Sequence, residues 1–209
     1  SSKCSYDDSF WHLDTTDTPS VNAVLKKMDA LMNTYKLDGL KVDFIDDEHP
    51  DPALGTAEST FHFVQELPRI VTAVKPDALL EFRQRYNVPQ LLPYATQFRA
   101  GDVPFDYLDN FNRIAHIRTC LGDGVPVHAD PVYWANVETP ENIARHLVAS
   151  LAAVPMVSMD LTVLTEVEKK IFRHYIDFYK NHVEIYRKGH WDVAYSGTMA
   201  SMISGSWNG

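Results

Sequence analysis

Short apolar segments alternate with amphipathic segments along this chain, and the alternation restricts the folds that it can adopt. The segments with strand character are 40–46, 78–83, 96–100, 125–129 and 155–159. Helical patterns cover 18–36, 58–74, 105–119 and 165–187, and another helix opens at Thr139-Pro140-Glu141. Apolar strands that are separated by helices are typical of a parallel sheet with helical crossovers. The sequence therefore predicts an α/β fold.

The helix predicted over 18–36 has clear start and face signals. Thr18 is the expected N-cap and Pro19 the first helical residue. Apolar residues then recur at intervals of three and four, which gives the helix one apolar face. In the helix over 58–74, Pro68 is expected to kink or split the helix, because proline lacks the N–H that the helix needs.

Each predicted strand is apolar where it begins and polar where it ends. The polar residues at the ends, in chain order, are Asp43 and Asp46, Arg83 and Arg85, Arg99 and Asp102, His128 and Asp130, and Ser158 and Asp160. In a (β/α)₈ barrel the carboxyl ends of the strands surround the active site. A doubly wound open sheet also binds ligands there, but it normally carries a glycine-rich phosphate loop, and this sequence has no G-x-G-x-x-G. The pattern favours a barrel.

The first of these strands carries two charges on one face. Side chains alternate along a strand, so Lys41 and Asp43 point to the same side, opposite Leu40, Val42 and Phe44. A buried ion pair is costly unless it is well satisfied, which makes this pair a candidate for chemistry. The alternative is an edge strand whose charged face contacts water.

Asp43 and Asp102 are the candidate catalytic pair for chemistry at a sugar carbon. Carboxyl groups about 5–5.5 Å apart give retention through a covalent intermediate, and about 6.5–9.5 Å gives inversion. Lys41 and the arginines favour an ionised nucleophile at Asp43, and Asp102, after Gly101, is the expected acid and then base. Carboxylates at strand ends also cap the following helix, and that interpretation stays open.

Four segments occur in the order found in one enzyme family. They are Gly39-Leu40-Lys41-Val42-Asp43-Phe44-Ile45, Glu81-Phe82-Arg83-Gln84, Phe98-Arg99-Ala100-Gly101-Asp102, and Val127-His128-Ala129-Asp130 with Trp134. From about Leu13 to Arg187 the chain resembles the melibiase-type α-galactosidases. The resemblance implies a retaining glycoside hydrolase without a cofactor, with Asp43 as nucleophile and Asp102 as acid/base. The resemblance also implies residues that bind the substrate. With Arg99 included, the predicted substrate-binding residues are Lys41, Arg83, Arg99, His128, Asp130 and Trp134.

The length of the chain suggests an incomplete barrel. A (β/α)₈ barrel needs about 250 residues, whereas this chain has 209. We expect residues 1–188 to form about the last five or six βα units of an excised or truncated catalytic region. Residues 189–209 are expected to begin a C-terminal β module or to form a loose tail. An open barrel exposes strand edges, so oligomerisation or pairing with the missing barrel segments is expected.

Composition limits the partners. The net charge is −9, with 19 Lys and Arg against 28 Asp and Glu, which argues against nucleic acid. No apolar run approaches the ~20 residues that span a bilayer, and no signal-peptide pattern opens the chain, so the compartment is not indicated. Cys4 and Cys120 are expected to be free thiols.

The leading hypothesis is hydrolysis of terminal α-linked galactose, with a carbohydrate as the partner. One alternative is a non-catalytic carbohydrate-binding or truncated fragment. Another is a metal-dependent barrel hydrolase, although no H-E-x-x-H or C-x-x-C spacing supports a metal site. A serine nucleophile is not indicated, because the G-x-S-x-G motif is absent.

Overall fold

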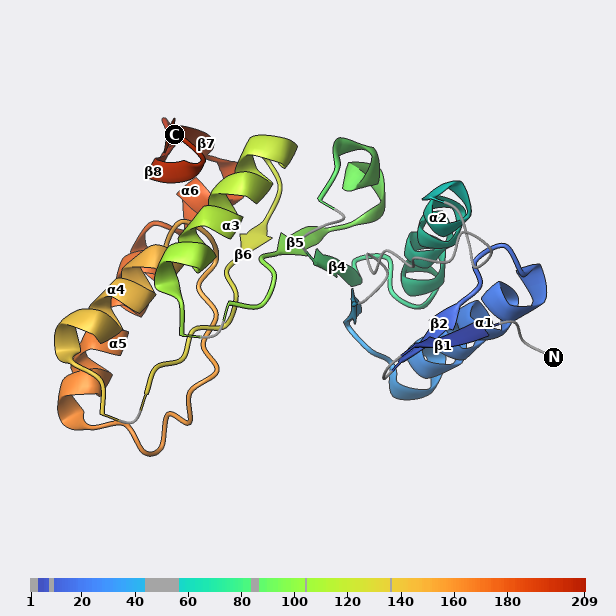
Figure 1. Cartoon of the computed structure of the whole chain (residues 1–209), viewed down its shortest axis with the longest axis horizontal. Coiled ribbons are helices and arrows are strands. Elements are labelled where there is room, and N and C mark those ends of the chain that lie inside the picture. Colours follow the sequence, from blue (N-terminus) through green and yellow to red (C-terminus); the bar gives the residue numbers. More distant parts are fainter. Residues whose placement is uncertain (1–3, 8–9, 44–56, 84–86, 104, 136) are drawn as a thin grey trace. The chain divides into compact units, whose positions relative to one another are not determined.

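The computed structural model describes residues 4–7, 10–43, 57–83, 87–103, 105–135 and 137–209. The described residues belong to two compact units, one formed by Ser1–Phe82 with Pro93–Thr96 and the other by Arg83–Leu92 with Gln97–Gly209. Figure 1 shows the labelled helices and strands along the chain. Each unit is described by itself below.

The described strands include a four-stranded parallel sheet, which confirms the α/β prediction. Its strands are β3 (Gly39–Val42), β4 (Leu79–Arg83), β5 (Gln97–Arg99) and β6 (Val127–His128), in the order β3-β4-β5-β6. A closed barrel is not part of what the structure describes. The strand predicted over 155–159 is wrong, because this segment makes only isolated parallel bridges, from Val154 to His128 and from Val157 to Val132.

The first unit begins with an antiparallel hairpin of β1 (Cys4–Asp7) and β2 (Phe10–Leu13), which the sequence patterns did not predict. Helix α1 (Thr18–Tyr35) follows. Its N-cap is Asp17 rather than Thr18, because the Asp17 carboxylate accepts a hydrogen bond from the Ser20 N–H. The cap therefore lies one residue before the predicted position.

Helix α2 (Ala57–Val74) packs against α1 and contains Pro68. The helix continues past the proline, so the predicted split is wrong. The Phe63, Val64 and Leu67 side chains are buried on its apolar face. Behind these helices β3 pairs with β4, and a Cβ on Gly39 would lie only 2.3 Å from the Leu79 carbonyl oxygen. Glycine is needed at position 39 because the two backbones approach so closely.

In the second unit the helices α3 (Tyr107–Leu121), α4 (Pro140–Ser150) and α5 (Glu166–Asn181) pack in that order. The 3₁₀ turn η1 (Pro89–Tyr94) covers the region where a proline-containing loop was predicted. Helix α4 begins where the sequence predicted a helix to open, and Thr139 is its N-cap, with its hydroxyl accepting from the Asn142 N–H. The single helix predicted over 165–187 is wrong, since α5 ends before His182 and α6 (Val183–Lys188) follows it.

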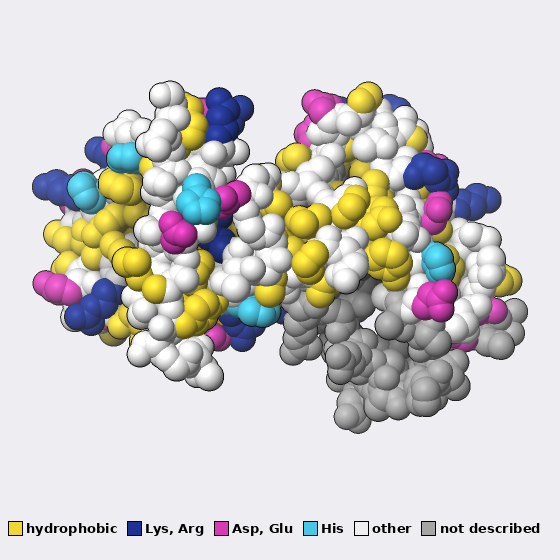
Figure 2. Space-filling view, turned by 90° about the horizontal axis from the view of Figure 1, so that it is seen from above, with side chains coloured by type: hydrophobic (Ala, Val, Ile, Leu, Met, Phe, Trp, Pro, Cys, Tyr) yellow, Lys and Arg dark blue, Asp and Glu magenta, His cyan; other side chains and the backbone are white. Residues whose placement is uncertain are grey.

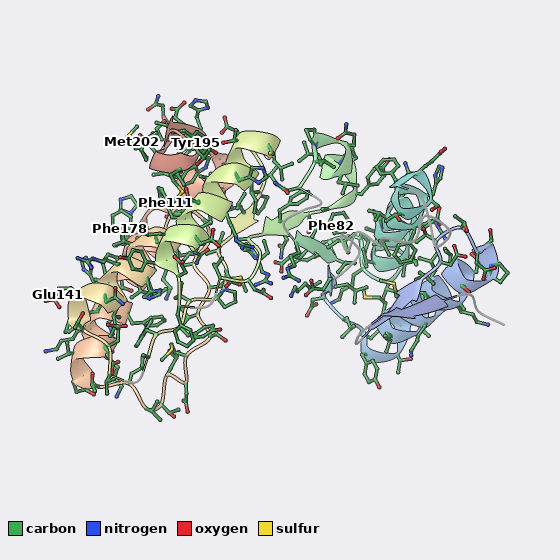
Figure 3. All side chains as sticks on the ribbon, in the orientation of Figure 1. Phe82, Phe111, Glu141, Phe178, Tyr195 and Met202 are labelled. Atoms are coloured by element: carbon green, nitrogen blue, oxygen red, sulfur yellow. The ribbon has the colours of Figure 1, made fainter. Side chains whose placement is uncertain are left out.

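The C-terminal residues form an antiparallel hairpin of β7 (His190–Ser196) and β8 (Met199–Ser206). Figure 3 labels Tyr195 and Met202 on this hairpin. The guanidinium of buried Arg118 on α3 lies 3.5 Å from the centre of the Trp191 ring, and burial lowers the Arg118 pKa to about 10. The Ala200 N–H also donates to the Asn112 side chain at 2.7 Å. The hairpin is thus attached to α3, and its role as the start of a further module stays a prediction.

On the face shown in Figure 2, Lys and Arg side chains lie among acidic and hydrophobic ones.

Within the ranges that the structure describes, every helix is too short or too polar to cross a bilayer.

The contact between His190 and Asp123 should depend on pH. The Asp123 carboxylate lies 2.5 Å from His190 Nδ1, which raises the His190 pKa above its ordinary value of 6.5 and lowers the Asp123 pKa. Its stabilising contribution is therefore lost as pH rises through the raised pKa of His190, and also as pH falls through the lowered pKa of Asp123. An NMR titration of the His190 ring should give a midpoint above 6.5.

Asp123→Asn should lower that midpoint more than Asp192→Asn does. Asp192 lies 3.3 Å from the other ring nitrogen and is a weaker cause of the shift. Equal midpoints in the three proteins would contradict this assignment.

Candidate functional site

Asp43 and Lys41 form the ion pair that the strand pattern predicted. Lys41 Nζ lies 2.9 Å from Asp43 Oδ2, at the end of β3 in the first unit. The side chains are 42% and 27% exposed, so the pair is partly open to water rather than buried. A carboxylate that is both paired and accessible can act as a nucleophile without a large desolvation cost.

Asp102 lies in the second unit, just after β5, and accepts hydrogen bonds from two arginines. Arg83 Nη2 donates to Asp102 Oδ2 at 3.1 Å, and Arg99 Nη2 donates to Asp102 Oδ1 at 2.8 Å. The Asp102 side chain is 60% exposed. Asp102 does not cap the following helix, because the N-cap of α3 is Asp106. The helix-cap interpretation therefore does not apply to Asp102.

Asp130 fixes the turn that carries Asp102. Its Oδ1 accepts from Arg99 Nη1 at 2.6 Å, and its Oδ2 accepts from the Val103 N–H at 2.8 Å. Arg99 precedes Asp102 and Val103 follows it, so one carboxylate joins both sides of the turn. The Arg99 and Asp130 side chains are each only 6% exposed. Their geometry gives the turn a fixed shape, because charge-assisted hydrogen bonds are short and strong.

Asn110 on α3 holds the backbone of Asp130 in place. Its side-chain oxygen accepts from the Asp130 N–H at 3.1 Å, and its side-chain nitrogen donates to the Asp130 carbonyl at 3.2 Å. The sequence analysis gave Asn110 no role. The sequence signal for a role of Asn110 is its helical register with Ile114 and Ile117, and all three side chains are buried on one face of α3. A polar side chain on a buried face usually has a hydrogen-bond partner.

Burial is the largest influence on Asp130 and raises its pKa, while the Val103 N–H and the Arg99 guanidinium act in the opposite direction. The carboxylate form of Asp130 thus depends on these two partners. A buried charge with this many hydrogen bonds is expensive to disturb, since removing one partner leaves another charge unpaired.

The remaining predicted residues are found in different surroundings. His128 ends β6, and its carbonyl accepts from the Ala100 N–H at 3.0 Å. Trp134 is buried with Val132, Ile143 and Leu147, and its indole N–H donates to Glu168 at 3.2 Å. The predicted contacts of His128 and Trp134 with a sugar stay predictions.

Other polar strand-end residues do not join this cluster or are not described. Asp160 accepts hydrogen bonds from the backbone and hydroxyl of Thr162, which is a local turn. Asp46 and Arg85 lie outside the described residues. Among the residues that are described, no group of three His, Cys, Asp or Glu side chains could hold a metal ion.

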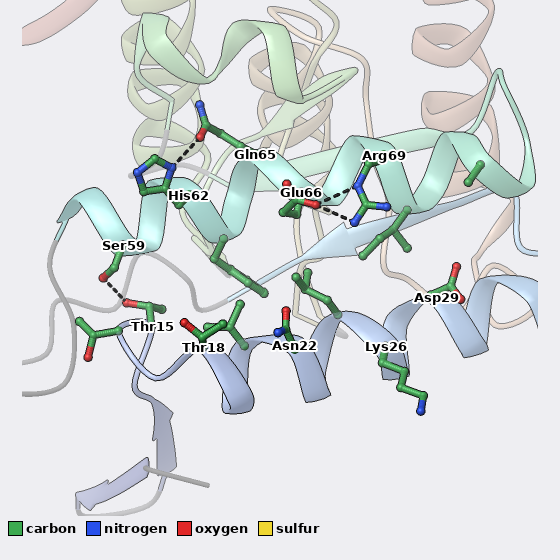
Figure 4. A pocket seen from close by; sticks show the side chains of 16 residues that line it. Thr15, Thr18, Asn22, Lys26, Asp29, Ser59, His62, Gln65, Glu66 and Arg69 are labelled. Carbon is green, nitrogen blue, oxygen red and sulfur yellow. Dashed lines mark hydrogen bonds and ion pairs between the residues drawn. The ribbon is translucent and has the colours of Figure 1, made fainter.

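A groove of about 730 Å³ lies between α1 and α2 in the first unit (Figure 4). Some of its polar side chains bind one another. The Thr15 hydroxyl lies 2.7 Å from that of Ser59, and Arg69 donates to Glu66 at 2.7 Å. The groove contains none of the residues predicted for catalysis or sugar binding.

Solved structures resemble this chain in fold. The GH36 α-galactosidase AgaA from Geobacillus stearothermophilus matches with a TM-score of 0.68 at 15% identity, over 92% of this chain and 28% of that chain. An α-galactosidase from Lactobacillus brevis matches with a TM-score of 0.66 at 17% identity, over 90% of this chain and 27% of that chain. A cyclomaltodextrinase matches with a TM-score of 0.55 at 13% identity, over 92% of this chain and 39% of that chain.

The chain shares its fold with the barrel domains of glycoside hydrolases. It spans less than two fifths of the length of each of these three structures. No family model matches the sequence, and no curated protein matches it.

Asp130→Asn should destabilise the second unit strongly. The asparagine amide has one acceptor oxygen, and its nitrogen cannot accept, so it cannot bind both Arg99 and the Val103 N–H. The buried Arg99 guanidinium also loses its main counter-ion. Breaking a buried ion pair costs about 3–5 kcal/mol. Urea unfolding followed by circular dichroism should show the loss.

The matched control is Asp102→Asn, which removes an exposed carboxylate bound to the same Arg99. Because the Asp102 side chain is 60% exposed and Arg99 keeps its contact with Asp130, the midpoint should change much less than in Asp130→Asn. Similar losses in the two variants would show that Asp130 does not support the turn.

Proposed function

We propose that the protein is a retaining glycoside hydrolase that cleaves terminal α-linked galactose. The observation that carries this proposal is the pair of partnered, accessible carboxylates after β3 and β5, the first and third strands of the parallel sheet. Carboxyl ends of parallel strands are where barrel enzymes build their active sites. A retaining mechanism requires the two carboxyl groups to lie about 5–5.5 Å apart, and this distance between Asp43 and Asp102 is part of what we propose.

In the proposed mechanism Asp43 attacks the anomeric carbon and Asp102 gives a proton to the leaving oxygen. Water then attacks the glycosyl-enzyme ester, with Asp102 accepting the proton, so the product keeps the α configuration. Both Asp102 oxygens accept hydrogen bonds from arginines. Protonation takes up one of the acceptor sites of Asp102 and removes its charge, so it weakens the contacts with the arginines. The Arg83 contact is the longer and more exposed, so we assign the weakening mainly to Arg83.

Sugar hydroxyl groups are the proposed ligands of the other residues. Lys41, beside the nucleophile, and the two arginines beside Asp102 offer the hydrogen-bond donors that hydroxyl oxygens accept. His128 and Trp134 are proposed to lie around the sugar, and Asp130, whose two oxygens bind Arg99 and the Val103 N–H, is proposed to act on the sugar site through Arg99. Related folds support this choice of substrate, since AgaA variants have been solved with 1-deoxygalactonojirimycin and with raffinose.

An α-glucoside is the second candidate substrate, because the fold is also similar to a cyclomaltodextrinase. Matched aryl α-galactoside and α-glucoside substrates distinguish the two through the ratio of their kcat/KM values. The wild-type protein should favour the galactoside. Loss of activity on chelation would instead support a metal-dependent hydrolase, and binding without turnover would support a carbohydrate-binding protein.

Asp43→Asn should lower kcat for an aryl α-galactoside by roughly 10⁴-fold or more, because the amide cannot form the covalent intermediate. Proton NMR of the wild-type reaction should show α-galactose before it mutarotates. A variant with normal turnover, or initial release of β-galactose, would reject the retaining mechanism. Asp160→Asn is a matched control, because Asp160 serves only a local turn among the described residues and should leave kcat unchanged.

Asp102→Asn should show a strong dependence on the leaving group. General acid catalysis contributes about 10²–10⁴-fold, and a good leaving group needs little of it in the first step. Hydrolysis of raffinose should therefore fall much further than formation of the glycosyl-enzyme from a dinitrophenyl galactoside, measured as a pre-steady-state burst. Equal losses for both substrates would assign Asp102 a role other than proton donor.

A further inference from the structure

Phe105 lies in a backbone conformation that bulky residues rarely adopt. Its φ is +62°, in the left-handed region that normally favours glycine. The Asp106 N–H donates to the Val103 carbonyl at 3.1 Å, so Phe105 is the third residue of a tight turn. Turns with positive φ at the third position usually have glycine or asparagine there. A phenylalanine at this position therefore carries backbone strain, which concentrates at functional sites.

The Phe105 side chain is exposed despite that strain. It is 58% exposed, so burial in the core does not compensate for the unfavourable backbone. Its main ring contact is with Tyr133, whose ring centre lies 4.4 Å away at an interplanar angle of 78°. Tyr133 is partly buried and follows Asp130 by three residues, just as Phe105 follows Asp102 by three. The two rings form an aromatic pair at the surface of the second unit.

Both sides of the Phe105 turn are fixed. The Val103 N–H donates to buried Asp130, and the Asp106 side chain accepts from the Asp109 N–H to cap α3. Asp130 is also bonded to Arg99, which donates to Asp102. The aromatic pair and the Asp102 carboxylate are therefore held by the same buried group. A ring fixed in this way loses little conformational entropy when it binds a ligand.

We propose that Phe105 and Tyr133 form the binding site for the leaving-group sugar of the substrate. This inference rests on the proposed function, in which Asp102 protonates the leaving oxygen and the leaving group must lie on the Asp102 side. An aromatic face packs against the apolar C–H face of a pyranose, while the hydroxyl groups of the sugar remain in water. The site therefore takes the second sugar ring of an oligosaccharide such as raffinose. It does not take the galactose that is cleaved.

Phe105→Gly tests the site in the full-length protein. Glycine adopts the positive φ without strain, so the variant keeps its fold and loses only the ring. The dissociation constant for raffinose, measured by calorimetry in the Asp43→Asn background, should rise about tenfold. Binding of free galactose, which fills only the cleaved-sugar position, should change less than about twofold. Tyr133→Leu should have the same selective effect.

Phe178→Ala is the matched control, because it also removes an exposed ring in the second unit, on α5 (Figure 3). It should leave the affinity for both sugars unchanged. Unchanged raffinose affinity in Phe105→Gly, or equal losses for raffinose and galactose, would overturn the proposed site.

The two proposals fail in different ways. If the wild-type protein hydrolyses α-galactosides and Phe105→Gly binds raffinose normally, the aromatic site is wrong and the hydrolase assignment remains. If the wild-type protein binds raffinose through Phe105 but hydrolyses no α-galactoside, the site remains and the hydrolase assignment falls. If raffinose does not bind and no α-galactoside is hydrolysed, both are wrong.

Discussion

The buried contact between Arg99 and Asp130 is the interaction on which the candidate site depends. Burying two charges costs several kcal/mol for each ion unless their hydrogen bonds are satisfied. Here the Asp130 carboxylate accepts from Arg99 and from the Val103 N–H, and Asn110 binds the Asp130 backbone on both sides. The hydrogen bonds of the Arg99–Asp130 pair thus fix the shape of one turn, and that turn carries Asp102 and Phe105.

Two other ion pairs between described residues differ because water reaches them. Lys41 and Asp43 are partly exposed, and His190 and Asp123 lie at the surface. Exposed pairs contribute little to stability and respond to salt and pH. The Lys41–Asp43 contact can therefore rearrange at little cost, and the His190–Asp123 contact can adjust with pH. Of these three contacts between described residues, the Arg99–Asp130 contact has the burial that gives a fixed geometry.

Local signals in the sequence predicted part of this structure. The alternation of strands and helices predicted the parallel sheet, and the strand period predicted the contact between Lys41 and Asp43. Residues 155–159 are as apolar as a strand, but strand formation depends on pairing with a neighbour, and only isolated bridges form. The roles of Asn110 and Phe105 depend on residues distant in sequence or on a backbone angle. The register of Asn110 with Ile114 and Ile117 indicates a buried helix face, but no local pattern gives the partner of Asn110 or the backbone angle of Phe105.

A residue that transfers protons and a residue that fixes geometry need opposite surroundings. A proton donor, the role proposed for Asp102, must be reached by substrate and water, and Asp102 is 60% exposed. A support must resist exchange with water, and Asp130 is 6% exposed. Arg99 joins the two, because one guanidinium donates to both carboxylates. Replacing Arg99 by lysine would keep the charge but lose this double contact, since a single ammonium lacks the planar fork of donors. The geometry of Asp102 therefore depends on an arginine at position 99, and not merely on a positive charge there.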